Sequence, residues 1–74
     1  MRLKDHFDMT AFLKQVQLCA GEVFFCTQNG DRLNLKSILS TYVFSTLTMQ
    51  RETLLSGWIE ADENSLADLA AFLE

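Results

Sequence analysis

The spacing of apolar residues at the start of the chain predicts a short strand followed by a helix. Residues 1–4 alternate apolar and basic side chains, which is typical of a strand. Asp8 then offers a side-chain oxygen that can cap a helix N-terminus, and Gly21 is a residue that commonly ends a helix. Between these two, apolar residues recur at helical spacing: Met9, Phe12, Leu13, Val16, Cys19 and Ala20.

The next segment has the pattern of a β-hairpin. Residues 22–27 are rich in β-branched and aromatic side chains, and residues 32–35 provide a returning strand. Between them lies the pair Asn29-Gly30, which a tight type I′ turn prefers because both of its central residues take positive φ. We therefore expect two antiparallel strands joined by a type I′ turn.

The second half of the chain alternates helix and strand. Ser37 is placed to cap a short helix that runs to about Val43, and residues 45–51 are a polar connection. Residues 53–60 are the longest strand candidate, and Asp62 caps a final helix with its own apolar stripe. The expected buried side of the short helix comprises Ile38, Leu39, Tyr42 and Val43, and the stripe of the final helix comprises Leu66, Leu69, Ala70 and Leu73.

The order of these elements predicts the fold class. Strand, helix, strand, strand, helix, strand, helix is typical of an α+β protein with an antiparallel sheet and helices on one face, an open-faced two-layer sandwich. Seventy-four residues are enough for one domain and too few for two. The sequence therefore predicts a single domain over residues 1–74.

One alternation of the central strands would leave apolar side chains on the open face of the sheet. If Phe24, Cys26 and Ile59 point into the core, three residues project from the other face: Val23, Phe25 and Trp58. An apolar patch of this kind indicates a protein partner or a homodimer formed through that face. The opposite alternation would place Trp58 in the core, and the pattern alone leaves both open.

Charge and composition narrow the function classes. A net charge of −4 with only six Lys and Arg argues against a nucleic-acid partner. No apolar run approaches the roughly 20 residues that cross a bilayer, so we expect no membrane insertion, and no secretory leader is visible, so we expect a cytoplasmic protein. One His and two separated Cys do not make a zinc site or a nucleophilic triad. We expect no metal, no cofactor and no independent catalytic activity.

From Thr10 to the C-terminus the chain resembles the histidine-containing phosphocarrier (HPr) family of the bacterial sugar phosphotransferase system. The resemblance lies in the Phe-Leu-x-x-Val core of the first helix at 12–16, in Thr-Gln-Asn-Gly at 27–30 and in Leu-Lys-Ser-Ile-Leu at 35–39. It implies a β-α-β-β-α-β-α chain with a four-stranded antiparallel sheet of order 1-4-2-3. It also implies a role in sugar transport, with components of the phosphotransferase system as partners.

The match places His6 at the position of the family's phosphoacceptor, but the residues that follow it differ from those of the family. The family has an arginine two residues later and then a proline, where this chain has Asp8 and Met9. Asp5 and Asp8 would each repel a bound phosphoryl group by roughly 1 kcal/mol. We therefore expect a degenerate acceptor site and a regulatory or protein-binding module.

Two other functions remain open from the sequence. An active phosphocarrier would accept a phosphoryl group on His6 and pass it to a sugar-transport subunit. A dimeric small-molecule sensor of ferredoxin-like topology would have a similar pattern of elements.

Ser37 has a further meaning under the resemblance. It stands where the family's regulatory serine is phosphorylated by a dedicated kinase, and a phosphate at a helix N-terminus is favoured by the helix dipole and the free amides. An ordinary helix cap explains the same residue without any kinase.

Overall fold

The computed structural model describes residues 1–47 and 50–74 and has an α+β architecture. The helices are α1 (Met9–Leu18), α2 (Ile38–Thr46), α3 (Arg51–Ser56), α4 (Glu63–Asp68) and the short 3-10 helix η2 (Ala70–Phe72). The strands are β1 (Val23–Cys26), β2 (Arg32–Asn34) and β3 (Trp58–Ala61). The α+β class predicted from the order of elements is confirmed.

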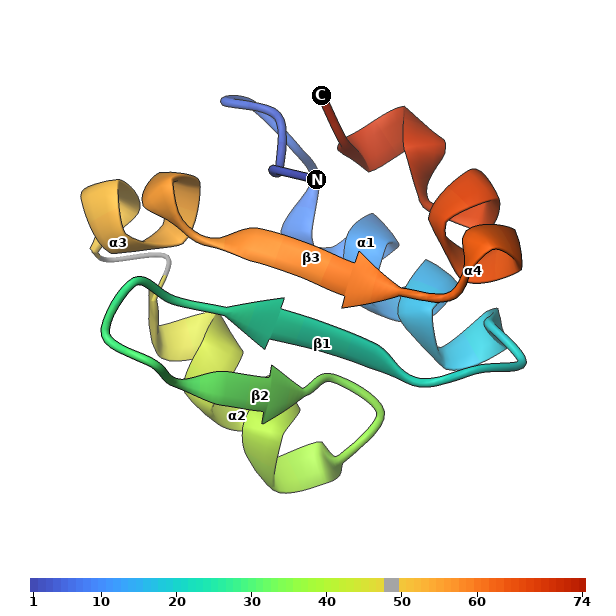
Figure 1. The fold of residues 1–74 in the computed structure, drawn as a ribbon, viewed down its shortest axis with the longest axis horizontal. Coiled ribbons are helices and arrows are strands. Elements are labelled where there is room, and N and C mark those ends of the chain that lie inside the picture. The colour runs from blue at the N-terminus through green and yellow to red at the C-terminus, as the bar shows by residue number, and fades with distance from the viewer. Residues whose placement is uncertain (48–49) are drawn as a thin grey trace.

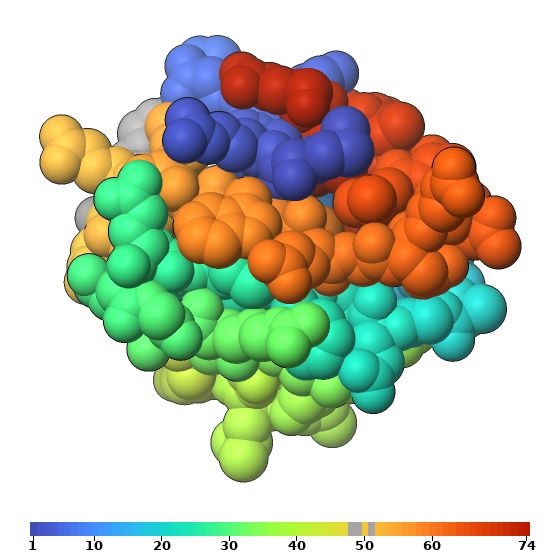
Figure 2. Space-filling view, viewed as in Figure 1, coloured from blue at the N-terminus to red at the C-terminus, as the bar shows by residue number. Residues whose placement is uncertain are grey.

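The three strands form one antiparallel sheet of order β2-β1-β3 (Figure 1). Phe25 in the central strand lies opposite Leu33 of β2 and Ile59 of β3, so these three side chains share one face of the sheet. Helices α1 and α2 lie behind the sheet in Figure 1, on the side where these side chains are buried. The other face is open, and it is the side seen in Figure 2.

The predicted fourth strand is not formed in the described part of the chain. Met1 exchanges two backbone hydrogen bonds with Ile59 of β3, of 3.2 and 2.6 Å. The segment then turns to the C-terminus, where Leu3 makes an isolated bridge to Leu73. Figure 2 shows the two chain ends, blue and red, against each other beside β3. The three strands that do form lie in the order predicted for them, 4-2-3. The first residues do not add a fourth strand, because they share their hydrogen bonds between β3 and the C-terminal segment.

The expected strand over residues 53–60 was wrong in its first half. Helix α3 continues to Ser56, and only the last residues of that stretch belong to β3. Leu54 is buried in the core, and Glu52 in the first turn interacts favourably with the helix dipole. The helix is too short for a periodic signal in the sequence, so tertiary burial of Leu54 decides the local structure.

Gly57 joins α3 to β3 at a point of close backbone approach. A Cβ at this position would collide with the ring of Phe25 and would lie 2.6 Å from the carbonyl oxygen of Cys26. Any other L-residue would force the two segments apart. The glycine thus allows β3 to begin directly against β1.

The hairpin between β1 and β2 is confirmed, but its turn is not type I′. Gly30 alone takes positive φ, 92°, whereas a type I′ turn would require it at Asn29 as well. The Gly30 amide donates to the Thr27 carbonyl at 3.1 Å, and the Thr27 amide donates to the Asp31 carbonyl at 3.0 Å. These bonds close a longer turn that ends in a left-handed glycine, so Asn29 keeps an ordinary conformation.

A cluster of phenylalanine rings fills the space between the sheet and its helices. Phe44 of α2 packs 5.0 Å from Phe25 and 5.9 Å from Phe12, centroid to centroid. Phe12 in turn meets the rings of Phe7 and Phe72. Phe12, Phe25 and Phe44 are fully buried, so these rings join α1, the sheet and α2 into one core.

We expect Phe44→Ala to lower the free energy of unfolding by about 3–5 kcal/mol, because it removes a buried ring and leaves a cavity. Urea denaturation followed by circular dichroism measures this change. Tyr42→Ala, on the exposed side of the same helix, is the matched control and should change stability by about 0.5 kcal/mol or less. Equal losses in the two variants would contradict this description of the core.

Candidate functional site

Helix α2 presents an apolar surface to solvent. Its outward side chains are Ile38, Leu39, Tyr42 and Val43, which are 87%, 79%, 72% and 46% exposed. Positions i, i+1, i+4 and i+5 lie on one side of a helix, so the four residues are neighbours. These four residues are called the α2 face below.

The inward side of α2 is more polar than its outward side. Phe44 is the one fully buried residue of the helix. The Thr41 hydroxyl donates to the Leu35 carbonyl at 2.8 Å, and the Ser45 hydroxyl donates to the Thr41 carbonyl at 3.0 Å. These hydroxyl groups can therefore face the protein without losing hydrogen bonds.

The sequence prediction that the α2 face is the buried side of its helix was wrong. Apolar residues at helical spacing normally mark the side that packs on the core. Here Phe44 occupies the space between Phe12 and Phe25, and the rotation of α2 that seats this ring turns the α2 face outward. One signal in the sequence was missed: residues 37–50 contain no Asp, Glu, Lys or Arg that would mark a solvated side.

The start of α2 is fixed to the end of α1 by Lys36. Its ammonium group donates to the carbonyls of Val16, Gln17 and Cys19 at 3.2, 3.1 and 2.6 Å. The Gln17 side-chain amide donates to the Leu35 carbonyl at 3.2 Å. A cation at the carbonyl end of a helix also interacts favourably with its dipole. The segment just before the α2 face is therefore tied to the end of α1 by hydrogen bonds.

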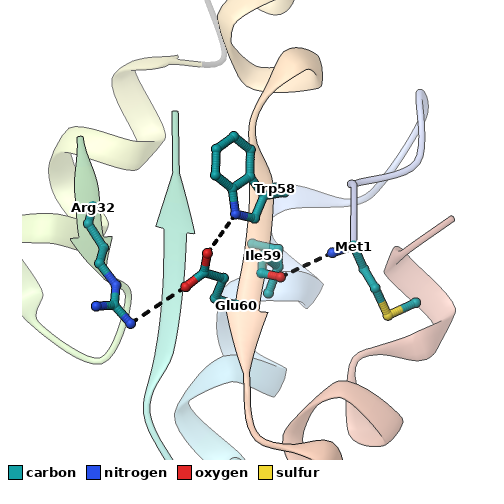
Figure 3. A network of polar contacts seen from close by, with 5 residues as sticks. All are labelled: Met1, Arg32, Trp58, Ile59 and Glu60. Carbon is teal, nitrogen blue, oxygen red and sulfur yellow. Dashed lines mark hydrogen bonds and ion pairs between the residues drawn. The ribbon is translucent and has the colours of Figure 1, made fainter. Parts of the chain in front are cut away.

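The open face of the sheet carries a polar network in place of the predicted apolar patch (Figure 3). The Trp58 indole donates to the Glu60 carboxylate at 2.8 Å, and Arg32 pairs with the same carboxylate at 3.6 Å. The Arg32 guanidinium also lies 4.1 Å from the centroid of the Phe24 ring. Two shallow hollows of about 470 and 460 Å³ share Arg32 and Glu60 in their linings.

The patch predicted from Val23, Phe25 and Trp58 is not formed. Val23 and Phe25 are fully buried, and Trp58 lies half-buried on the open face. Because Phe25 lies directly opposite Ile59, the two must point to the same side, and Ile59 belongs to the core. The expected homodimer through the open sheet face loses its apolar basis with this correction.

Hydrogen bonding and burial change the pKa values of two groups on the open sheet face, the Glu60 carboxyl and the Cys26 thiol. The indole donor of Trp58, and then the charge of Arg32, lower the pKa of Glu60 below its ordinary value of 4.5. Burial raises the pKa of the Cys26 thiol, and the nearby Glu60 carboxylate acts in the same direction. Cys26 is a free, buried thiol that remains protonated at neutral pH.

His6, the predicted phosphoacceptor, lies exposed ahead of α1. Its Nε2 is 3.5 Å from a carboxylate oxygen of Asp5. The N-terminus of α1 is capped by Asp8, whose carboxylate accepts a hydrogen bond from the Ala11 amide at 3.1 Å. A backbone amide that could otherwise bind an anion is therefore already bonded to a carboxylate of this chain.

Ser37 lies at the N-cap position of α2, as the sequence predicted. Its carbonyl accepts the first helical hydrogen bond, from the Thr41 amide at 2.9 Å. The Ser37 side chain makes no capping hydrogen bond. It is half-buried and directly precedes Ile38, the first residue of the α2 face.

Within residues 1–47 and 50–74, no group of three or more His, Cys, Asp or Glu side chains could hold a metal ion. None of the helices in the same residues has the length and apolar character to cross a membrane. Comparison of the chain with protein-family models, curated proteins and solved structures finds no match.

We expect Glu60→Gln to reduce the acid sensitivity of the protein. A carboxyl whose pKa is lowered by folding stabilises the native state fully above pH 4.5, and this stabilisation is lost as the pH falls through the lowered pKa. The difference in urea midpoint between wild type and variant should therefore shrink between about pH 6 and about pH 3. Fluorescence of Trp58, the single tryptophan, follows the unfolding. Glu74→Gln, which removes an exposed carboxylate outside the network, is the control, and an equal change in both variants would contradict the assignment.

Proposed function

We propose that this chain is an HPr-like protein-binding module that docks another polypeptide through the α2 face and does not relay phosphoryl groups. The observation that carries the proposal is the outward position of Ile38, Leu39, Tyr42 and Val43. Large apolar side chains gathered on one exposed side are typical of an interaction surface. A place in the cytoplasm, among the proteins of the sugar phosphotransferase system, belongs to the proposal through the sequence resemblance alone.

The size and composition of the α2 face support docking of a protein. The exposed fractions of its side chains correspond to roughly 500 Å² of surface, within the range of functional patches on small proteins. Because no charged residue lies between positions 37 and 50, covering this surface removes no charge from water. Aliphatic and tyrosine side chains are suited to the centre of a protein interface.

The contacts that position α2 also support docking. The packing of Phe44 in the core fixes which side of α2 faces the protein. The three hydrogen bonds of Lys36 attach the segment just before α2 to the end of α1. A surface that is ordered before binding loses less conformational entropy when the partner covers it.

The surroundings of His6 support the absence of relay. A phosphohistidine carries two negative charges and needs donors close by. Asp5 lies 3.5 Å from the ring, and Asp8 occupies the helix N-terminus that follows. Each carboxylate opposes a phosphoryl group by roughly 1 kcal/mol when partly solvated.

Incubation with phosphoenolpyruvate and purified enzyme I tests the absence of relay. We expect the intact mass of the chain to remain unchanged, because the carboxylates disfavour the phosphorylated ring. His6→Ala is the matched control. A gain of one phosphoryl group that His6→Ala abolishes would overturn the proposal and favour an active phosphocarrier.

A photo-crosslinking amino acid at position 42 tests the docking surface in expressing cells. We expect a discrete crosslinked product from this position, because Tyr42 is 72% exposed on the α2 face. Position 18 is the control, since Leu18 is an exposed apolar residue of α1. Identical products from both positions, or none from position 42, would contradict docking through α2.

A further inference from the structure

We infer that the polypeptide covering the α2 face is a second copy of this chain, in a two-fold dimer with α2 packed against α2. The inference rests on the proposed docking function and names its partner. Three features of the described residues support it: the area of the face, its lack of charge and the geometry of a single exposed helix.

The area of the α2 face suits a small homodimer. Roughly 500 Å² from each copy gives roughly 1,000 Å² buried in total, which is the lower limit for a specific protein interface. Interfaces at this limit are weak, so we expect a dissociation constant of about 1–100 μM. Two copies at that concentration would be in equilibrium between monomer and dimer.

The distribution of charge favours this face for contact between two identical acidic chains. Each copy carries a net charge of −4, so most pairings of its surface bring like charges together. Among the four described α-helices, α2 is the one without a charged residue. Contact through α2 therefore buries no carboxylate and keeps the acidic α4 away from the interface.

The geometry of α2 suits a two-fold contact. A homodimer interface is formed by the same surface twice, so the surface must be complementary to itself. The four residues form a ridge along one helix, and two such ridges can pack at an interaxial distance of about 8–10 Å. The network of Trp58, Glu60 and Arg32 belongs to the sheet and shares no residue with the α2 face, so it is not part of the proposed contact.

Sedimentation equilibrium of the purified full chain, from about 1 to 500 μM, measures the association directly. We expect the weight-average mass to rise from 8.4 kDa toward twice that value. Leu39→Asp should weaken dimerisation at least tenfold, because it places two carboxylates in the interface. Leu18→Asp is the matched control, since Leu18 is 75% exposed on α1, and it should dimerise like wild type.

A second variant and a measurement of intermolecular contacts distinguish a loss of the interface from misfolding of Leu39→Asp. Tyr42→Lys should also give a monomer, and circular dichroism should show native helix content in every variant. In a mixture of isotope-labelled and unlabelled wild type, we expect intermolecular nuclear Overhauser effects between residues of the α2 face. A dimer whose intermolecular contacts lie elsewhere, or which survives both α2 variants, would overturn the inference.

The outcomes separate the dimer from the proposed function. Wild type that stays monomeric up to the highest concentration overturns the dimer. If position 42 then crosslinks to a different protein, docking through α2 stands without it. Phosphorylation of His6 by enzyme I would instead overturn the non-relaying function, whatever the oligomeric state.

Discussion

The packing of one phenylalanine ring determines the surface that this protein presents. Phe44 is the fully buried residue of α2, held between Phe12 of α1 and Phe25 of the sheet. Successive residues of a helix are rotated by about 100°, so fixing one side chain fixes the direction of all the others. With Phe44 inside, Ile38, Leu39 and Tyr42 lie on the outer half of the helix, and Val43 lies at its flank, 46% exposed. Core packing and the exposed apolar surface thus have the same cause.

The parts of the fold that follow from local signals could be predicted from the sequence. The cap at Asp8 and the hairpin around Gly30 need only neighbouring residues, and both were found. The buried side of α2 could not be predicted, because two sets of residues can each form a helical stripe and tertiary packing selects the one with Phe44. The same holds for Phe25, whose face depends on its register with Ile59. The uncharged run over residues 37–50 was the available clue to the candidate site.

The two sides of the molecule differ in chemistry. Around Glu60 the open sheet face is covered by hydrogen bonds, an ion pair and a cation over an aromatic ring, so its aromatic groups already have partners in the chain. The α2 face has aliphatic groups and a tyrosine in contact with water. Water is released most favourably from the latter kind of surface, which is why binding is assigned there. The resemblance to HPr adds a proposed context and does not alter this physical distinction.

Lys36 has a consequence for the order in which the chain folds. Its ammonium group stabilises carbonyls that lie 17 to 20 residues earlier in the sequence, and α1 has no basic residue in its own last turn. The last turn of α1 therefore gains this stabilisation only after the hairpin between them has closed. Contacts of this separation form later than local ones, because the intervening loop must first lose its entropy. The end of α1 and the beginning of α2 are thus expected to become ordered in the same step.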